Sequence, residues 1–437
     1  MKKYVWICAV GLCGAPAAAA QGPAAWFAKH GRGKLEYKVL WHEGSRPQDS
    51  RKARSEFRLD LELDIPLSDQ ARLFLRPDVR WDTDHLSAGL FDESRRDTMR
   101  RPIFHFQEAY LEWRPGPWEF RLGEQIFAWG TADGYNPTDN LNPRDYLDLA
   151  DSEKIPVFAL SATYYLDEVT SLQAVLVPFF TPSRFDGQDS RWSFFPAEPP
   201  LDFDRDLPAD SLSNMQVGLR ARTSVRGWDF SLSYFDGYND IGRPTLTYER
   251  FAPLGPLGPV VLRPEGVRFA YDKVRTLGFD FATTWKHVGL HGEVAHTWTD
   301  GDRDDSYLQY VLGIDYTWAD IRPGQNLRLV LEYAGEEVTS RGPERDGVPP
   351  TRLGRYLDDS ILARIVYELD ETRKLELKGV ANLRGDDNFY LQPAFTWDLR
   401  ENLRLKLGAD IFTGAGESFF GQFDDNDRFF LLLQYYF

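Results

Sequence analysis

The chain contains very little sulfur. Of its 437 residues two are cysteine and three are methionine, and both cysteines, Cys8 and Cys13, lie near the N-terminus. Small secreted domains usually depend on disulfide bonds, because their cores are too small to stabilise them. Beyond Cys13 no thiol is available for a disulfide, so the rest of the fold must be held by its own hydrogen bonds and packing.

Long apolar stretches and an excess of basic residues are also missing. After residue 20 there is no run of about 18 or more apolar residues, so the sequence predicts no membrane-spanning helix. Lysine and arginine number 51 against 67 aspartates and glutamates, a net charge of −16. This balance disfavours nucleic acid as a partner.

The sequence also lacks the residue arrangements of a catalytic site. Its seven histidines are scattered, and no serine–histidine constellation can be assembled from them. His291 and Glu293 would share one face of a strand, but no third partner accompanies them. We therefore expect that the protein is not an enzyme.

The first twenty residues have the pattern of a secretory signal peptide. Lys2–Lys3 form a short basic region, residues 4–12 form an apolar region, and Ala18–Ala20 supply the small residues of a cleavage site. We expect cleavage after Ala20, which leaves 49 basic against 67 acidic residues. The predicted signal peptide therefore comprises residues 1–20.

The last segment of the chain alternates between apolar and other residues. Because side chains at every second position of a strand share a face, one face carries Phe429, Leu431, Leu433, Tyr435 and Phe437. A terminal strand that ends in phenylalanine resembles the C-terminal signature of bacterial outer-membrane β-barrels, which their assembly machinery recognises. By this resemblance Tyr435 and Phe437 form the assembly signal. The alternative is an edge strand of a soluble β-sandwich.

Alternation of the same kind recurs along the whole chain, and no stretch shows a helical period. We count 18 segments of about 10–12 residues, the length that a tilted strand needs to cross a bilayer. Because backbone polar groups need partners inside a membrane, such strands must close into a barrel. The sequence therefore predicts an all-β, transmembrane, up-and-down antiparallel barrel whose last strand pairs with its first. The predicted organisation is the signal peptide at 1–20, a short periplasmic segment at 21–32 and one barrel domain at 33–437. The short connection at 385–387 leaves 16 strands as an alternative. The expected segments start near residues 33, 54, 71, 103, 118, 155, 169, 212, 227, 274, 288, 306, 327, 358, 373, 388, 403 and 427.

The connections between these segments alternate between short and long. Turns such as 167–168 and 286–287 are followed by loops such as 179–211 and 236–273. Short periplasmic turns opposite long extracellular loops are typical of outer-membrane barrels. Ten of the thirteen tryptophans lie near segment ends, where interfacial side chains gather. They are Trp41, Trp81, Trp113, Trp118, Trp129, Trp228, Trp285, Trp298, Trp318 and Trp397.

Charged residues occupy the polar face of the predicted strands. A barrel of 18 strands is wide enough for a water-filled channel, so these charges would line its lumen. We expect a basic ladder on one strand beside an acidic ladder on its neighbour, with further arginines around the wall. The predicted lumen charges are Arg72, Arg76, Arg80, Arg121, Arg220, Arg222, Asp60, Glu62 and Asp64.

The third long loop, residues 130–154, is rich in acids and contains two asparagine–proline pairs. Proline holds the residue before it extended and fixes turns, so we expect a compact loop. The third loop of porin-type channels commonly folds inward, and we expect this one to narrow the lumen and to set up a transverse field with the arginine ladder. The alternative is an extracellular hairpin with solvated acids. The expected constriction residues are Asp133, Asn136, Asp139, Asn142, Arg144 and Asp145.

A motif at the start of this loop resembles a known group of proteins. The pattern G-x-Q-x-x-x-W-G followed by N-P-x-D is similar to a stretch of large Gram-negative outer-membrane porin-like families, near the alginate-export proteins and uncharacterised porins. The resemblance spans residues 123–153 only, and it implies the barrel architecture rather than a substrate. The matching positions are Gly123, Gln125, Trp129, Gly130, Asn136, Pro137 and Asp139.

These features predict a channel in the outer membrane of a Gram-negative bacterium that passes small hydrophilic or anionic solutes passively. The alternatives are an outer-membrane barrel enzyme of lipase or protease type and a structural barrel that sheathes a partner protein. Expected partners are membrane lipid, lipopolysaccharide, the assembly machinery and small solutes, and the pattern is compatible with a homotrimer. We expect no cofactor; the alternative is calcium bound in the loops at two groups of aspartates. They are Asp300, Asp302, Asp304, Asp305, Asp424, Asp425 and Asp427.

Overall fold

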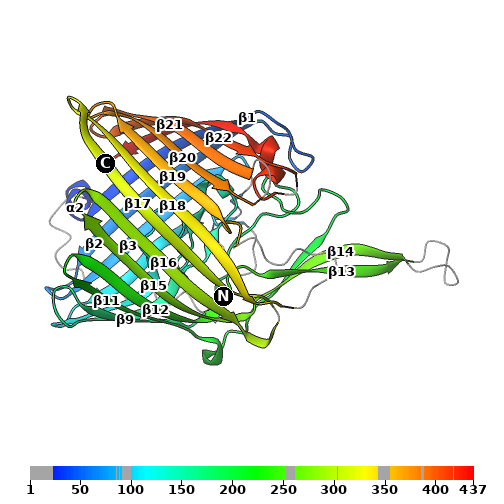
Figure 1. The fold of residues 1–437 in the computed structure, drawn as a ribbon, viewed down its shortest axis with the longest axis horizontal. Helices are drawn as coiled ribbons and strands as arrows, with labels where there is room; N and C mark the ends of the chain where they lie inside the picture. The colour runs from blue at the N-terminus through cyan, green and yellow to red at the C-terminus, as the bar shows by residue number, and fades with distance from the viewer. Residues whose placement is uncertain are drawn as a thin grey trace.

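The chain folds into a barrel whose wall consists of eighteen antiparallel strands (Figure 1). Each wall strand pairs with the next one along the chain, and β23 pairs with β1, so the sheet closes on itself. The computed structural model describes residues 23–84, 86–87, 89–90, 100–251, 261–302, 304–342, 355–384, 388–416 and 418–437. The predicted signal peptide lies outside these residues.

The structure confirms the predicted fold class and the count of 18 strands rather than 16. Every wall strand begins within four residues of its expected start. The wall strands are β1 (Gly31–His42), β2 (Ala53–Pro66), β3 (Ala71–Asp82), β4 (Phe104–Trp113), β5 (Trp118–Gln125), β8 (Val157–Tyr165), β9 (Ser171–Val177), β11 (Gln216–Val225), β12 (Trp228–Tyr238), β15 (Lys273–Trp285), β16 (Val288–Thr299), β17 (Ser306–Arg322), β18 (Gln325–Ser340), β19 (Ser360–Glu368), β20 (Arg373–Asn382), β21 (Asn388–Arg400), β22 (Leu403–Thr413) and β23 (Arg428–Tyr436).

The closing seam lies between the first and last strands. Gly33 and Phe437 exchange two backbone hydrogen bonds, at 2.7 and 3.0 Å, and the ladder runs on from Lys34 opposite Tyr436 to His42 opposite Arg428. Because both edge strands of the sheet are used in this seam, the backbone groups of the wall find partners within the wall. The predicted pairing of the terminal strand is thus confirmed.

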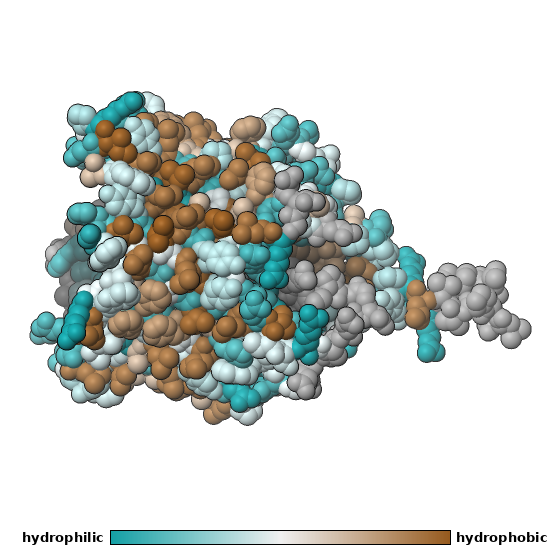
Figure 2. All heavy atoms as spheres, viewed as in Figure 1, coloured by the Kyte–Doolittle hydropathy of each residue, from teal (hydrophilic) through white to brown (hydrophobic). Residues whose placement is uncertain are grey.

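Alternation sorts the side chains of each strand between the two faces of the wall. On β23 Leu431 and Leu433 point outward, 39 and 37 % exposed, while Arg428 and Phe430 point inward and are buried. Apolar side chains are spread over the visible outer wall in Figure 2. The outer face is therefore apolar and the inner face carries the charges, the reverse of a soluble protein.

The tryptophans follow the predicted pattern with one exception. Nine of the ten expected at strand ends are exposed on the outer face: Trp41, Trp81, Trp113, Trp118, Trp228, Trp285, Trp298, Trp318 and Trp397. The expectation for Trp129 was wrong, because its side chain is 3 % exposed and lies inside the barrel. Its indole Nε1 donates a hydrogen bond to Gln173 of β9 at 3.0 Å. Trp129 belongs to the interior rather than to the interfacial belt.

A short helix, α2 (Pro23–His30), precedes the barrel where the sequence predicted no helix. Its Phe27 stacks on Phe437 with ring centroids 6.0 Å apart, which places α2 beside the closing seam (Figure 1). A single helix of eight residues is too short to establish a 3.6-residue period by eye. No helix of the described residues is long and apolar enough to span a membrane.

The long connections contain structure of their own, where only loops were expected. The segment Arg243–Phe251 (β13) pairs with β14, and β14 pairs in parallel with β10, so that the β13–β14 hairpin projects away from the barrel (Figure 1). The strands β10 and β14, a two-stranded ribbon of β6 and β7, and four short 3₁₀ helices complete the described elements. They are β6 (Arg144–Asp145), β7 (Glu153–Lys154), β10 (Asp202–Asp206), β14 (Val261–Ala270), η2 (Leu149–Asp151), η3 (Leu212–Asn214), η4 (Asp300–Asp302) and η6 (Gly421–Asn426).

Candidate functional site

The arginine ladder of β3 lies on the inward face, but its charges are neutralised by neighbouring carboxylates. Arg72 pairs with Glu112 of β4 and with Asp64 of β2, both at 2.7 Å. Arg76 pairs with Asp60 at 2.7 Å. The predicted basic and acidic ladders therefore face each other across neighbouring strands and form ion pairs.

The other predicted lumen charges also lie on the inner face. Arg121 pairs with Glu112 at 2.9 Å, and Glu62 is held by an arginine of β1 at 2.5 Å. Arg220 lies 3.5 Å from Asp280 and places its guanidinium over the Trp129 ring. Several inward-facing cations of the wall strands form no ion pair with any described residue, among them Arg222, Arg328, Lys374 and Lys378.

Residues 126–156, which include the predicted constriction loop, fold against the inner wall as two lobes. We call residues 128–140 the first lobe and residues 143–154 the second lobe. The first lobe reaches β15, β16, β18 and β19, whereas the second lobe reaches β23, β1, β2 and β3. The two lobes therefore extend to different sides of the wall from a common root beside β5 and β8.

Two buried carboxylates of the wall hold the first lobe. Glu293 of β16 accepts the backbone N–H groups of residues 131–132 at 2.6 and 2.8 Å, and also the hydroxyl of Thr138 at 2.8 Å. Glu332 of β18 accepts the N–H groups of residues 133–134 at 2.6 and 2.9 Å. Because carboxylate acceptors form strong hydrogen bonds, these two side chains fix the course of the lobe. Glu293 is thus a structural anchor for the loop.

Acidic side chains hold the second lobe to the opposite wall. Asp148 accepts hydrogen bonds from Arg428 of β23, the shortest at 2.7 Å, and Asp151 pairs with Lys38 of β1 at 2.6 Å. Glu153 pairs with arginines of β2 and β3 at 2.6 and 2.8 Å. The arginine on β3 is Arg80, the last member of the predicted ladder. The loop acids and the ladder therefore meet in direct contact at this point rather than across open space.

The residues of the sequence motif cluster at the root of the two lobes. Gly123 has φ 137°, and a Cβ there would come within 2.1 Å of a carbonyl oxygen of β4, so only glycine fits. Gln125 donates to a carbonyl oxygen of β8 at 2.7 Å. Gly130 has φ 93° and lies against the Glu293 carboxylate. The motif thus encodes the way this segment leaves the wall.

Asn142 joins the two lobes at that root. Its amide donates to the carbonyl oxygens of Gln125 and Ile155 at 3.1 and 2.9 Å, and its Oδ1 accepts the N–H of Phe127 at 2.7 Å. Lys154 pairs with Asp139 across the same junction. A buried amide with all of these partners acts as a rigid spacer between the lobes.

A second inward segment, residues 178–201, was missed by the sequence analysis. We call it the mouth segment. It leaves the wall after β9, the seventh wall strand, yet its tip contacts the β1–β2 connection and η6. The Arg191 guanidinium donates to the carbonyl oxygens of Gly44 and Asp425 at 2.8 and 3.2 Å. Trp192 packs against Phe412 and Phe423 with ring centroids 5.5 Å away from each.

The mouth segment also contacts the second lobe. Asp145 and Arg184 form a β-bridge and an ion pair at 3.2 Å, and the rings of Tyr146 and Phe185 stack 5.0 Å apart. Two long connections are therefore packed on each other inside the barrel. Aromatic residues in a long loop were the available sequence signal, because solvated loops rarely need them.

A polar cavity of about 200 Å³ lies between the two lobes. Its lining brings together four of the six predicted constriction residues, Asn136, Asp139, Asn142 and Arg144, with tyrosines from three parts of the chain. The remaining two predicted residues lie elsewhere: Asp145 is buried against Arg184, and Asp133 is 3.5 Å from Arg364 of β19. The other lining residues are Gly134, Tyr135, Pro137, Asn140, Tyr146, Ser152, Asn239, Asp240, Ile241, Tyr307, Gln309, Arg355 and Tyr356.

Comparison with known proteins adds a family. Residues 44–302 match the model of a family described as "Protein of unknown function (DUF1302)". The chain belongs to this family. The narrower likeness to alginate-export proteins receives no support from this match, and no curated protein matches the chain.

The DUF1302 chain also has distant likenesses among solved structures. Pseudomonas aeruginosa OccK11 (OpdR) is 11 % identical with a TM-score of 0.49, and 93 % of this chain and 95 % of that one are covered. An OmpF of Salmonella typhi is 11 % identical with a TM-score of 0.43, covering 93 and 97 %. The outer-membrane protein OmpTdeltaL8 of Vibrio cholerae is 10 % identical with a TM-score of 0.40, covering 93 and 98 %. At these distances the likenesses carry no argument about function.

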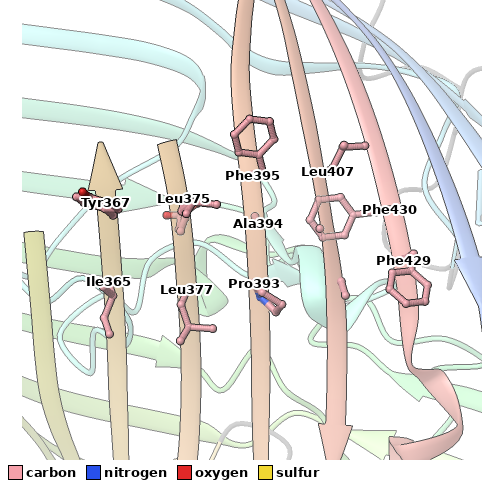
Figure 3. Close-up of a pocket in the computed structure, with 13 residues that line it drawn as sticks. Ile365, Tyr367, Leu375, Leu377, Pro393, Ala394, Phe395, Leu407, Phe429 and Phe430 are labelled. Carbon is pink, nitrogen blue, oxygen red and sulfur yellow. The ribbon is translucent and has the colours of Figure 1, made fainter. Parts of the chain in front are cut away.

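A hollow in the outer wall of the DUF1302 barrel takes no part in the interior site (Figure 3). It measures about 660 Å³ and lies across β19–β23, where Ile365, Leu377, Pro393, Leu407 and Phe429 line it. These side chains belong to the apolar outer face. In the described part of the chain no three His, Cys, Asp or Glu side chains are grouped so that they could hold a metal ion.

Proposed function

We propose that the protein is an outer-membrane channel through which small hydrophilic solutes, preferentially anions, pass passively. The observation that carries the proposal is the inverted polarity of the closed wall, apolar outside and charged inside. A wall of this kind suits a hydrocarbon environment on one side and water on the other. In this proposal residues 126–156 are the constriction of the passage.

The proposed location is the outer membrane of a Gram-negative bacterium. The expected signal peptide and the terminal Phe437 support export and recognition by the barrel assembly machinery. The exposed tryptophans at the strand ends support contact with lipid headgroups, because indole combines an apolar ring with a polar N–H. Membrane lipid and lipopolysaccharide are then the partners of the outer wall.

The preference for anions rests on the cations that remain unpaired. Arg222, Lys374 and Lys378 face the lumen without an ion pair to any residue in the described ranges. By contrast, Asp60 of β2 and Glu112 of β4 are held by arginines. Free charges of one sign along a polar passage attract solutes of the other sign.

The channel is tested by the entry of solutes into liposomes that contain the refolded protein. Graded sugars and organic acids should cause swelling up to a size limit, with the acids entering faster than neutral solutes of equal size. Sealed liposomes would contradict the channel and favour a structural barrel for a partner protein.

Selectivity is tested in planar bilayers under a salt gradient. The double variant K374E/K378E should shift the reversal potential toward cation selectivity, because two unpaired lumen charges change sign. Reversal of the paired ladder with R72E/R76E is the comparison, and its shift should be smaller since Glu112 and Asp60 already offset those arginines. An unchanged reversal potential in K374E/K378E would contradict the proposed anion preference.

A further inference from the structure

The cavity between the lobes contains one arginine whose guanidinium is not held by a carboxylate of the described residues. Arg144 lines the cavity, and its guanidinium forms no hydrogen bond or ion pair with the described residues. Neighbouring arginines behave differently: Arg428 is held by Asp148 and Asp410, and Arg355 by Asp305 and Glu336. Because an arginine is charged at any physiological pH, Arg144 presents an unused site for an anion.

The backbone holds Arg144 in a fixed place. Its N–H donates to the hydroxyl of Ser183 at 2.8 Å, and its carbonyl oxygen accepts the N–H of Arg184 at 2.9 Å. It also pairs with Lys154 in the β6–β7 ribbon. Three connections are made to this one residue, and two of them come from the mouth segment. They leave the base of the side chain little freedom, as a binding site requires.

The surrounding charges favour a single negative charge on the ligand. Asp240 also lines the cavity, and burial raises the pKa of its carboxyl group, while the nearby Arg144 opposes that rise. Asp139 is paired with Lys154, and Arg355 forms ion pairs with two carboxylates. The lining therefore has no second free cation for a dianion, and its acids would repel one.

Tyrosines supply flat walls and hydroxyl donors around Arg144. The Tyr146 ring is stacked on Phe185, and the Tyr356 ring lies 4.0 Å from Phe419 at an angle of 9°. Burial raises the pKa of Tyr135 and of Tyr356, so their hydroxyl groups stay protonated and can donate. A cavity of about 150 Å³ holds a benzene-sized molecule, so the volume here suits one ring with a carboxylate.

We propose that this cavity is a recognition site for a small cyclic monocarboxylate, whose carboxylate is bound by Arg144 between the tyrosine rings. The proposal rests on the proposed channel, because it assigns a preferred class of solute to the constriction. A planar guanidinium matches a carboxylate in a two-pronged geometry, which a lysine of the wall cannot reproduce.

Benzoate is a suitable probe, with benzyl alcohol as its neutral counterpart and phthalate as its dianionic one. Binding to the detergent-folded protein is measured by calorimetry, and block of the single-channel current is measured in planar bilayers. We expect benzoate to bind more tightly than either counterpart. Arg144→Gln should weaken benzoate binding by about tenfold or more, because a charged hydrogen-bonding partner is lost, and it should leave benzyl alcohol binding unchanged.

Lys378→Gln is the matched control, because it removes an unpaired lumen cation that does not line the cavity. It should change benzoate affinity by less than about twofold. An equal loss in both variants, or tighter binding of phthalate than of benzoate, would overturn the proposal. Arg144→Lys keeps the charge and tests the geometry: full affinity in this variant would also overturn it.

The result separates this site from the channel itself. If liposomes swell but Arg144→Gln binds benzoate as the parent does, the site is wrong and the channel stands. If Arg144→Gln loses binding in calorimetry but liposomes stay sealed, the site stands and the channel is wrong. The shift of gel mobility on boiling shows whether each variant is folded. If Arg144→Gln is not folded, Tyr356→Phe replaces it. We expect Tyr356→Phe to bind benzoate more weakly than the parent protein, and an affinity equal to that of the parent would contradict the site.

Discussion

The barrel wall and the segments folded inside it are held together by different interactions. In the wall each strand pairs with its neighbours through backbone hydrogen bonds, and β23 with β1 closes the ring. The two lobes and the mouth segment are instead held by side chains, such as Glu293 for the first lobe and Arg191 for the mouth segment. The wall is thus a repeating structure, whereas the position of the two lobes and the mouth segment inside it depends on a few individual residues.

This difference teaches where the protein can change without losing its fold. Removing one side chain from the wall leaves its backbone ladder in place. Removing one anchor from the interior leaves several N–H groups without a partner, and the segment can regain these hydrogen bonds by moving into water. The interior should therefore be released by substitutions that the wall tolerates.

The largest effect is expected from the double variant E293A/E332A. The two carboxylates accept five backbone N–H groups of the first lobe, and each buried donor left unpaired costs about 1–3 kcal/mol. The docked lobe should lose roughly 5 kcal/mol or more. We expect a severalfold rise in single-channel conductance and new protease cleavage within residues 126–156. Glu62→Ala, which removes another inward acid of the wall, should cause neither.

The next effect concerns the mouth segment and pH. Burial raises the pKa of Asp186 to about 7, and the Ser190 hydroxyl donates to its carboxylate. The docked carboxyl holds its proton more tightly than a solvated one. The protonated carboxyl therefore stabilises docking of the mouth segment fully below about pH 4, and this stabilisation is lost as the pH rises through about 7. Between these two limits the free energy of docking changes by on the order of 4 kcal/mol.

Hydrogen exchange of residues 178–201 between pH 5 and pH 8 measures this dependence. Protection should fall toward pH 8 in the parent protein. Asp186→Asn cannot ionise, so its protection should not change over this range. A parent segment that is equally protected at both pH values would show that Asp186 does not control docking.

The wall itself is tested by Leu431→Arg on its outer face. If this position lies at the bilayer midplane, the substitution should cost roughly 2–4 kcal/mol of folding free energy. Gln434→Arg is the matched control on the inner face of the same strand, where the new arginine would meet Glu36. Chemical unfolding in lipid vesicles measures both. Equal stability of the two variants would mean that the outer face of β23 does not meet lipid.

The same contrast explains what the sequence could predict. The period of two residues predicts the positions of the strands, and it also predicts that Arg72 and Asp60 face inward. The sequence does not predict which wall residues hold the interior segments, because pairs such as Asp148 with Arg428 are 280 residues apart and follow no period. Arg191 and Trp192 follow no period either, and their partners depend on a loop that reaches the far side of the barrel.

The smallest effect is expected at the junction between α2 and the closing seam. Phe27 stacks on Phe437, and such an aromatic pair contributes about 0.5–1.5 kcal/mol beyond the area that it buries. Phe27→Ala should therefore lower stability by roughly 1 kcal/mol and leave conductance unchanged, because the β1–β23 ladder does not depend on this ring. Trp26→Ala on the same helix is the control, since that ring lies against His30 within α2. If Phe27→Ala prevented assembly, α2 would be part of the closing seam, and the seam would then depend on individual residues as the interior does.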